Sequence, residues 1–276
     1  MHGTPKTIHR DQIVYALDRA SPSALQIVTG KTIVFETHDA RTGTIRSSRD
    51  LLDHPHPDGS IPATGPVSVT SAQPVDSLTV KILDIELADS AFVAVKQGVG
   101  LLSDRARDSA TRVVEIRDGS VHFATGICFP VRPMVGVIGT APATAAVETA
   151  YPGPHGGNMD NRYVTTGSTI HLPIAVPGAL LALGDVHASM GDGEITMVGL
   201  EAAARVTVRI SLVRGVQVTR PWIERPECWV TTGDAKDPAE ALRIAACDIQ
   251  ICQACAPGRF PVTTRAVFPR TEGSTP

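Results

Sequence analysis

Residues 204–213, ARVTVRISLV, show most directly what kind of fold this chain adopts. Apolar residues at positions 206, 208, 210 and 212 alternate with Thr207, Arg209 and Ser211. A period of two residues is typical of a β-strand that has one face on a core and the other toward water. Similar runs, rich in Val, Ile and Thr, occur at residues 25–37, 78–87, 112–117 and 169–176. Because Gly, Pro, Asn or Asp interrupts the chain about every eight to twelve residues, we predict a mainly β fold.

One helix is indicated late in the chain. The segment Asp237-Pro238-Ala239-Glu240 has a carboxylate at the N-cap, proline at the first helical position and glutamate at the third, a pattern typical of a helix start. Apolar residues at helical spacing follow until Pro257-Gly258. We therefore predict a helix from Asp237 to about Ala254, and shorter helices at residues 10–17 and 103–110.

The expected architecture is one of β-sandwich or barrel subdomains with a small α/β part and few helices. The 276 residues suffice for a single domain spanning residues 1–276. Within it we expect two β subdomains packed together, at about residues 1–145 and 146–276.

Composition and charge exclude several classes of protein. The formal net charge of −3 gives no general attraction to a phosphate backbone, so we expect no nucleic-acid partner. No run of about 18 apolar residues is present, and the N-terminal segment lacks the apolar core of a signal peptide. We expect a cytoplasmic protein with no membrane partner, in which the five cysteines are reduced thiols.

The segment GDVHASMGDGE, residues 184–194, has the greatest concentration of chemically active side chains. Two aspartates, one histidine and one glutamate lie among three glycines, and such side chains are ligands for zinc or another divalent cation. The segment is a candidate metal or acid/base site. Hairpin turns with an exposed histidine explain the same residues about equally well.

Two other segments are candidates for a site. In GPHGGNMD, residues 153–160, the glycines allow backbone amides to face a ligand, and Asn158 and Asp160 can donate and accept hydrogen bonds. An Asn/Asp-rich turn is the alternative. In Glu36-Thr37-His38-Asp39 strand alternation places Glu36 and Asp39 on opposite faces, so a solvent-exposed strand end is the alternative there.

Several motifs, in order, resemble the acetamidase/formamidase family over about residues 7–270. They are GSIPATGPVSV, PMVGVIGTAP, GPHGGNMDNR, GSTIHLPIAVPGALLALGDVHASMGDGE and ALRIAACDIQICQ. The resemblance implies a mainly β, acetamidase/formamidase-like enzyme that hydrolyses the C–N bond of small aliphatic amides. It also implies a homodimer or higher homo-oligomer, with a divalent cation, zinc or sometimes calcium, at the site.

By motif, the resemblance places metal ligands at four positions and catalytic groups at four others. The expected ligands are Asp39, Asp160, His187 and Asp192, and the expected catalytic residues are Glu36, Glu194, Asn158 and His155. Glu36 or Glu194 is expected to take the proton of the attacking water, and Asn158 to stabilise the oxyanion.

The sequence also departs from the family pattern. Ile61 stands where many relatives carry histidine, and Ser189-Met190 replaces a small polar pair. Two alternatives therefore stay open. One is an enzyme of the same scaffold that acts on a larger amide or acyl substrate in a biosynthetic pathway, and the other is a non-catalytic, metal-stabilised binding protein.

Overall fold

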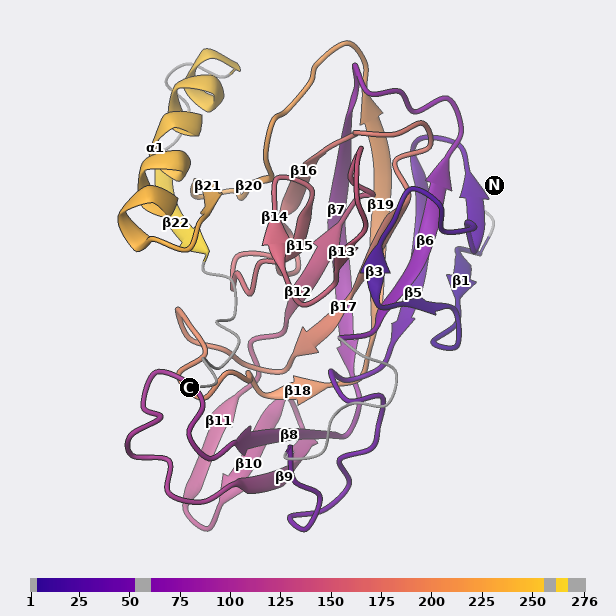
Figure 1. The fold of residues 1–276 in the computed structure, drawn as a ribbon. Coiled ribbons are helices and arrows are strands. Elements are labelled where there is room, and N and C mark those ends of the chain that lie inside the picture. Colours follow the sequence, from indigo (N-terminus) through magenta and orange to yellow (C-terminus); the bar gives the residue numbers. More distant parts are fainter. Residues whose placement is uncertain (1–3, 53–60, 256–261, 268–276) are drawn as a thin grey trace.

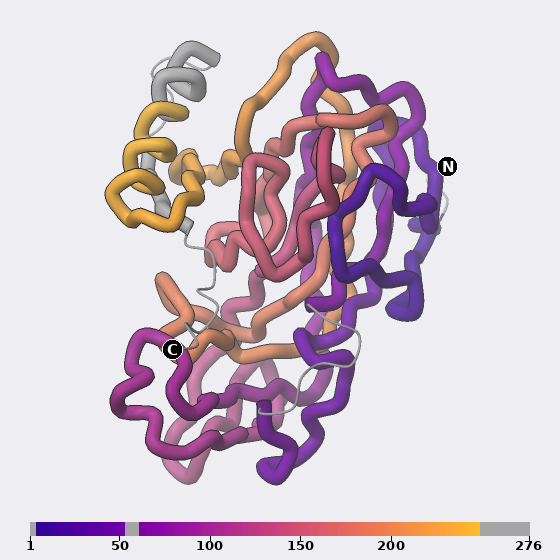
Figure 2. The backbone as a smooth tube through the Cα atoms, in the orientation of Figure 1, coloured from indigo at the N-terminus to yellow at the C-terminus, as the bar shows by residue number. Residues whose placement is uncertain are grey.

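The computed structural model describes residues 4–52, 61–255 and 262–267, with side chains up to residue 248. Figures 1 and 2 show two large sheets stacked on each other, with one helix at the side. The mainly β fold predicted from the sequence is confirmed.

The first sheet is built around the strand with which the sequence analysis began. β19 (Ala204–Val213) lies between β5 (Lys31–Thr37) and β7 (Ser77–Leu87) and is antiparallel to both. Its alternation is confirmed, because Val206, Val208 and Ile210 are fully buried. The other strands of this sheet are β1 (Lys6–Ile8), β16 (Thr169–Pro173), β20 (Trp222–Glu224), β21 (Trp229–Asp234) and β22 (Val262–Val267).

The second sheet carries the glycine-rich motifs on neighbouring strands. β17 (Leu181–His187) pairs with β12 (Met134–Gly139), β6 (Ala63–Val69) and β18 (Glu201–Ala202), and β12 also pairs with β15 (Gly156–Asn158). Four strands that carry these motifs, β6, β12, β15 and β17, are therefore neighbours in one sheet, and β18 joins them beside β17. The remaining strands are β2 (Ile13–Val14), β4 (Leu25–Ile27), β8 (Ser90–Val95), β9 (Ala110–Arg117), β10 (Ser120–Ala124), β11 (Ile127–Pro130) and β14 (Pro152–Gly153); β3 (Ala16–Leu17) and β13 (Val147–Glu148) form a small separate pair.

The main apolar core lies between the two sheets. Phe35, Val208 and Ile210 from the first sheet belong to the same buried cluster as Leu183 and Val186 from the second. Burial of these side chains removes apolar surface from water and holds the sheets together.

Strands β8 to β11 form a lobe with a smaller core of its own, which includes Ala91, Val114 and Val121. Figure 1 shows this lobe at one end of the sandwich. It joins the sandwich through β18, where Glu201 pairs with Phe92 of β8. β18 also pairs with the end of β17 on its other side.

Both large sheets combine strands from before and after residue 145, as in the pairs β5–β19 and β6–β17. Strand pairing therefore crosses the expected subdomain boundary. The division at residues 1–145 and 146–276 stays a prediction about folding units.

The predicted late helix is confirmed as α1 (Pro238–Cys255). The Glu240 N–H donates to Asp237 Oδ1 at 2.9 Å, so Asp237 is the N-cap. Figure 1 shows α1 beside β21 and β22. The side chains of Cys252 and Cys255 lie outside the described residues.

The two shorter predicted helices are wrong. Residues 13–17 form β2 and β3, because Ile13 and Val14 pair with β6 and tertiary pairing outweighs local helix propensity. At 103–110 the N–H groups of Ser103 and Arg105 bond the carbonyl groups three residues earlier, which makes tight turns before β9. Among the described residues no helix is both long and apolar enough to cross a bilayer.

Candidate metal centre

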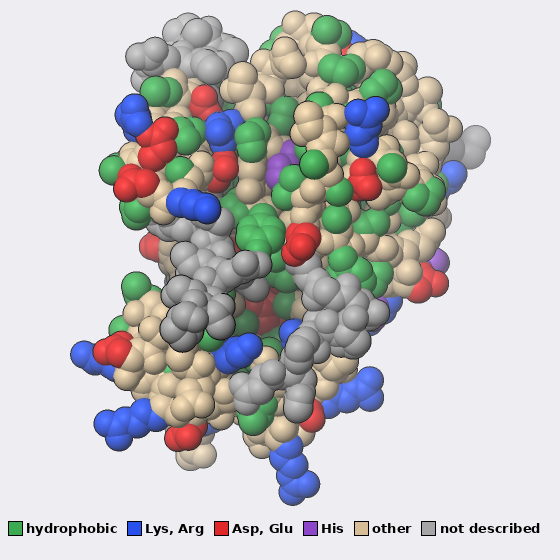
Figure 3. Space-filling view, viewed as in Figure 1, with side chains coloured by type: hydrophobic (Ala, Val, Ile, Leu, Met, Phe, Trp, Pro, Cys, Tyr) green, Lys and Arg blue, Asp and Glu red, His purple; other side chains and the backbone are tan. Residues whose placement is uncertain are grey.

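Four carboxylates surround the buried imidazole of His187 at the end of β17. The His187 Nε2 atom lies 3.4 Å from Glu201 Oε1, 3.6 Å from Asp185 Oδ2, 3.6 Å from Glu194 Oε1 and 3.9 Å from Asp160 Oδ1. We call these five residues the His187 cluster. In Figure 3 the surface is hollowed between the sandwich and the β8–β11 lobe, where Figure 1 shows β17 and β18.

Asp185 reaches the cluster because the backbone of β17 departs from regular strand geometry. Its φ of 56° is in the left-handed region, and Leu183 and Val186 on either side both belong to the main core. Regular alternation from Leu183 would turn Asp185 into that core. The left-handed backbone angle of Asp185 instead turns its carboxylate to the same side as His187.

Gly136 of β12 leaves the space that two of the carboxylates occupy. A Cβ atom at this position would lie 2.6 Å from Asp160 Oδ1 and 2.7 Å from Asp185 Oδ2. Side chains do not tolerate such distances, so the position requires glycine. Asp160, just after β15, has a φ of 40° that turns its carboxylate into this space.

Strand pairing places Glu201 opposite the histidine. His187 of β17 and Glu201 of β18 are register partners, and the Gly199 N–H donates to Glu201 Oε1 at 2.9 Å. A Cβ atom on Gly199 would lie 2.5 Å from His187 Nδ1. Gly199 therefore lets the backbone approach the imidazole closely and orients the glutamate.

The electrostatics of the cluster favour a bound cation. Burial of His187 opposes its protonation, but the carboxylates of Glu201, Asp185 and Asp160 outweigh that effect and raise the pKa of the imidazole well above 6.5. One imidazolium cannot balance four carboxylates. A divalent cation among them would supply the remaining positive charge.

The donor atoms also fit a metal ion in number and spacing. Asp160, Asp185 and His187 form one group of possible ligands, and His187, Glu194 and Glu201 form another, with the ligand atoms of each group within 4.8 Å of one another. Ligands about 2 Å from one ion lie about 3 to 4 Å apart, which is the spacing around His187 Nε2. Imidazole and carboxylate ligands together suit zinc.

Two of the expected ligands have other contacts. Asp192 is 74% exposed and its Oδ1 atom lies 3.1 Å from Arg162 Nε. The carboxylate of Asp39 accepts hydrogen bonds from the N–H groups of Arg41 and Gly43 at 2.8 and 2.9 Å. Asp39 thus stabilises a turn, and neither residue belongs to the two groups of possible ligands found among the described residues.

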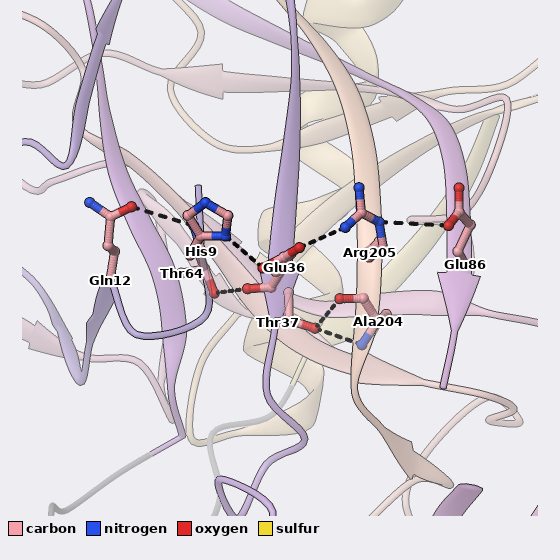
Figure 4. Close-up of polar contacts among 8 residues, drawn as sticks. All are labelled: His9, Gln12, Glu36, Thr37, Thr64, Glu86, Ala204 and Arg205. Atoms are coloured by element: carbon pink, nitrogen blue, oxygen red, sulfur yellow. Dashed lines mark hydrogen bonds and ion pairs between the residues drawn. The ribbon is translucent and has the colours of Figure 1, made fainter. Parts of the chain in front are cut away.

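Glu36 lies in a different polar cluster, on the first sheet. Its carboxylate accepts a hydrogen bond from His9 Nδ1 at 2.9 Å and one from Arg205 Nη1 at 2.6 Å, and Arg205 also faces Glu86 at 3.7 Å (Figure 4). The hydrogen bond from His9 is the main cause that lowers the pKa of Glu36. We call His9, Glu36, Arg205 and Glu86 the Glu36 network.

His155 and Asn158 lie on the hairpin that leads to Asp160. Burial lowers the pKa of His155 to about 4, and a Cβ atom on Gly153 would lie 2.7 Å from the His155 ring. Asn158 is buried, and its Nδ2 group donates to the Ala150 carbonyl at 3.5 Å. No described residue bonds its Oδ1 atom.

Sequence reasoning did not assign Asp185 and Glu201 as ligands. Asp185 was visible in the motif at 184–194, but the face to which it points depends on one irregular backbone angle. Glu201 lies outside that motif and reaches His187 through strand pairing. The available signal was one acidic residue in the otherwise apolar run VGLEAAA, residues 198–204, because a buried carboxylate needs a partner.

A model of the acetamidase/formamidase family matches this chain at residues 15–151 and 143–232. The chain belongs to the acetamidase/formamidase family. The crystal structure of an acetamidase from Bacillus halodurans is 31% identical, with a TM-score of 0.88 over 92% of this chain and 86% of that one.

Two curated relatives from this family are longer than the chain. A formamidase-like protein of Schizosaccharomyces pombe is 27% identical over an alignment of 254 positions that covers 70% of this chain and 62% of that protein. The formamidase of Methylophilus methylotrophus is 25% identical over an alignment of 208 positions that covers 55% of this chain and 51% of that protein. The chain thus spans between about half and two thirds of their length.

Proposed function

We propose that this chain is a metal-dependent amidohydrolase that cleaves the C–N bond of small aliphatic amides of the formamide and acetamide type, releasing a carboxylate and ammonia. The observation that carries the proposal is the buried His187 cluster, in which four carboxylates face one imidazole. Membership of the acetamidase/formamidase family supports the substrate class.

Asp160, Asp185, His187 and Glu201 would hold the cation. When bound, a zinc ion supplies Lewis-acid polarisation of the amide carbonyl and lowers the pKa of water toward about 7. We propose zinc rather than calcium because one of the ligands is an imidazole nitrogen, whereas calcium prefers an all-oxygen set.

Glu194 is the group that we assign to proton transfer. It lies on the loop between β17 and β18, its side chain is 8% exposed, and its Oε1 atom lies 3.6 Å from His187 Nε2. The Glu194 carboxylate takes the proton of the attacking water and returns it to the leaving nitrogen. An ionised carboxylate at this place therefore serves both halves of the reaction.

Asn158 would recognise the amide group of the substrate. Its Nδ2 group donates one of its two N–H groups to Ala150, and no described residue bonds its Oδ1 atom. Oδ1 suits the NH₂ group of a primary amide, and the second N–H of Nδ2 suits the oxyanion expected from the sequence. Neutral His155 would support the hairpin that carries Asn158, since burial disfavours its charge.

The assembly and location of the protein are also proposals. In line with the family resemblance, we propose a homodimer or higher homo-oligomer that acts on a small-molecule amide in the cytoplasm. Light scattering of the purified protein measures the first of these directly.

The decisive experiment is ammonia release from formamide, acetamide, propionamide and larger amides by protein of measured metal content. We expect turnover that chelation abolishes and zinc restores. Glu194→Gln should keep the fold and the metal and lose about 100-fold or more in rate. Activity that survives chelation, or no ammonia from any amide, would contradict the proposal.

A further inference from the structure

Glu194 is held in the cluster by a loop whose tip has few intrinsic constraints. The Glu194 loop, residues 189–199, is closed at its base where the Ala188 N–H donates to Leu200 O at 2.7 Å and the Leu200 N–H to Ser189 O at 3.1 Å. At the tip, an added Cβ on Gly191 or Gly193 meets nothing within 4 Å. A larger side chain would fit at both positions, and neither glycine has a positive φ. The two glycines therefore mainly give the loop backbone extra conformational freedom.

An ion pair crosses from this tip to the segment that carries Asp160. Arg162 Nε lies 3.1 Å from Asp192 Oδ1. Arg162 comes two residues after Asp160, and Asp192 comes two residues before Glu194. The two segments are thus linked twice, once where Asp160 and Glu194 both face His187 and once at the ion pair.

A second contact holds the other side of the loop. The Leu101 N–H donates to the Ile195 carbonyl at 3.0 Å, and a Cβ atom on Gly100 would lie 2.7 Å from the same oxygen. Residues 191–193 and Ile195 are exposed, yet the Glu194 side chain between them is 8% exposed. The loop is therefore tied down on both sides of Glu194, whose side chain turns inward.

When no cation is bound, electrostatic repulsion among the carboxylates acts against this arrangement. Glu194 approaches a cluster that already contains the carboxylates of Asp160, Asp185 and Glu201, and like charges at short range oppose its approach. The pair of Arg162 with Asp192 supplies an attraction between the same two segments. This ion pair joins the segment of Asp160 to the segment of Glu194, so its attraction offsets the repulsion between their carboxylates.

We propose that Arg162 and Asp192 are positioning residues whose ion pair holds the Glu194 loop closed over the His187 cluster. Their role in amide hydrolysis rests on the proposed function, but the closure of the loop does not. Because Arg162 is 40% exposed and Asp192 is 74% exposed, the expected effect is modest. Loss of the pair should change loop opening and turnover by about two- to fivefold.

The test is amide hydrogen exchange of residues 189–199 in the wild type, Arg162→Gln, Asp192→Asn and the charge-swapped double variant Arg162→Asp/Asp192→Arg, with and without zinc. Both single variants should exchange faster at Met197 and Gly199, and the double variant should recover part of the protection. Arg117→Gln is the matched control, since Arg117 forms an exposed pair with Glu115 at 3.5 Å in the β8–β11 lobe.

Kinetics separate positioning from general destabilisation. Each single variant should keep the wild-type melting temperature and zinc content while kcat for ammonia release falls, and added salt should slow the wild type more than Arg162→Gln. Unchanged exchange of residues 189–199 in both single variants would overturn the proposal. Faster exchange in a protein that hydrolyses no amide would support the closed loop and contradict the proposed function instead.

Discussion

The His187 cluster and the Glu36 network both combine histidine with carboxylates, yet they differ in burial and in charge balance. In the Glu36 network the carboxylate of Glu36 faces both His9, which is 66% exposed, and the guanidinium of Arg205. In the His187 cluster one fully buried imidazole faces four carboxylates. In the first arrangement the protein itself supplies the Arg205 cation beside the carboxylate, whereas the second has an excess of buried negative charge.

This difference separates a structural ion pair from a ligand site. An exposed, balanced pair contributes little free energy and joins neighbouring strands, here β5 and β19. A buried cluster of carboxylates with too few positive charges lowers the stability of the fold unless a cation binds among them. Residue type alone does not distinguish the two, since the sequence motifs around Glu36 and His187 are both rich in His, Asp and Glu.

The largest expected effect is on activity. His187→Ala removes a proposed metal ligand, so zinc content and ammonia release should both fall, with a rate loss of at least about 100-fold. His9→Ala removes the histidine of the Glu36 network and should leave both near the wild-type level. Equal activity losses in the two variants would break the distinction between the two regions.

The next largest effect should be that of metal binding on the free energy of unfolding. It is measured by thermal or denaturant unfolding of metal-free, chelated protein before and after zinc is added. At about 100 times its dissociation constant, zinc should raise the free energy of unfolding by about 3 kcal/mol. Glu201→Gln should reduce this gain, because it neutralises a carboxylate of the cluster. Glu36→Gln serves as the control and should keep the full gain.

His155 sharpens the comparison because it is buried and, within the described part of the chain, no carboxylate raises its pKa. Burial lowers its pKa from 6.5 to about 4 in the folded state, so between these values the unfolded chain binds more protons. Stability should therefore fall as the pH drops from about 6.5 toward 4. The loss at pH 5 should be about 2 kcal/mol.

This loss is measured as the difference between wild type and His155→Gln in denaturant unfolding at pH 7 and pH 5. The wild type should lose its advantage over the variant at the lower pH. A difference that does not change with pH would show that the histidine is not held neutral.

The smallest effect is expected in the Glu36 network. Glu36→Gln should lower the free energy of unfolding by about 1 kcal/mol or less, since its partners are largely exposed, and should leave kcat unchanged. Urea unfolding and the amide assay measure the two quantities. A rate loss comparable to that of Glu194→Gln would return Glu36 to the role of proton acceptor that the sequence suggested.

The sequence by itself determined the local structure and the segments that matter. The period of two in residues 204–213 is a property of nearest neighbours, and so is the N-cap at Asp237; both were predicted and both are confirmed. The motifs at 153–160 and 184–194 include Asp160, His187 and Glu194 of the His187 cluster, although the sequence left ordinary turns as an alternative for both motifs.

Only the tertiary structure decided which of these side chains meet. Asp185 joins His187 through a single left-handed residue, Glu201 through the register of β17 with β18, and Asp160 through the space that Gly136 leaves. Asp192, two residues from Glu194, instead turns outward to Arg162. Convergence of this kind depends on strand register and on backbone angles fixed by packing between distant segments, and local sequence patterns do not encode either of them.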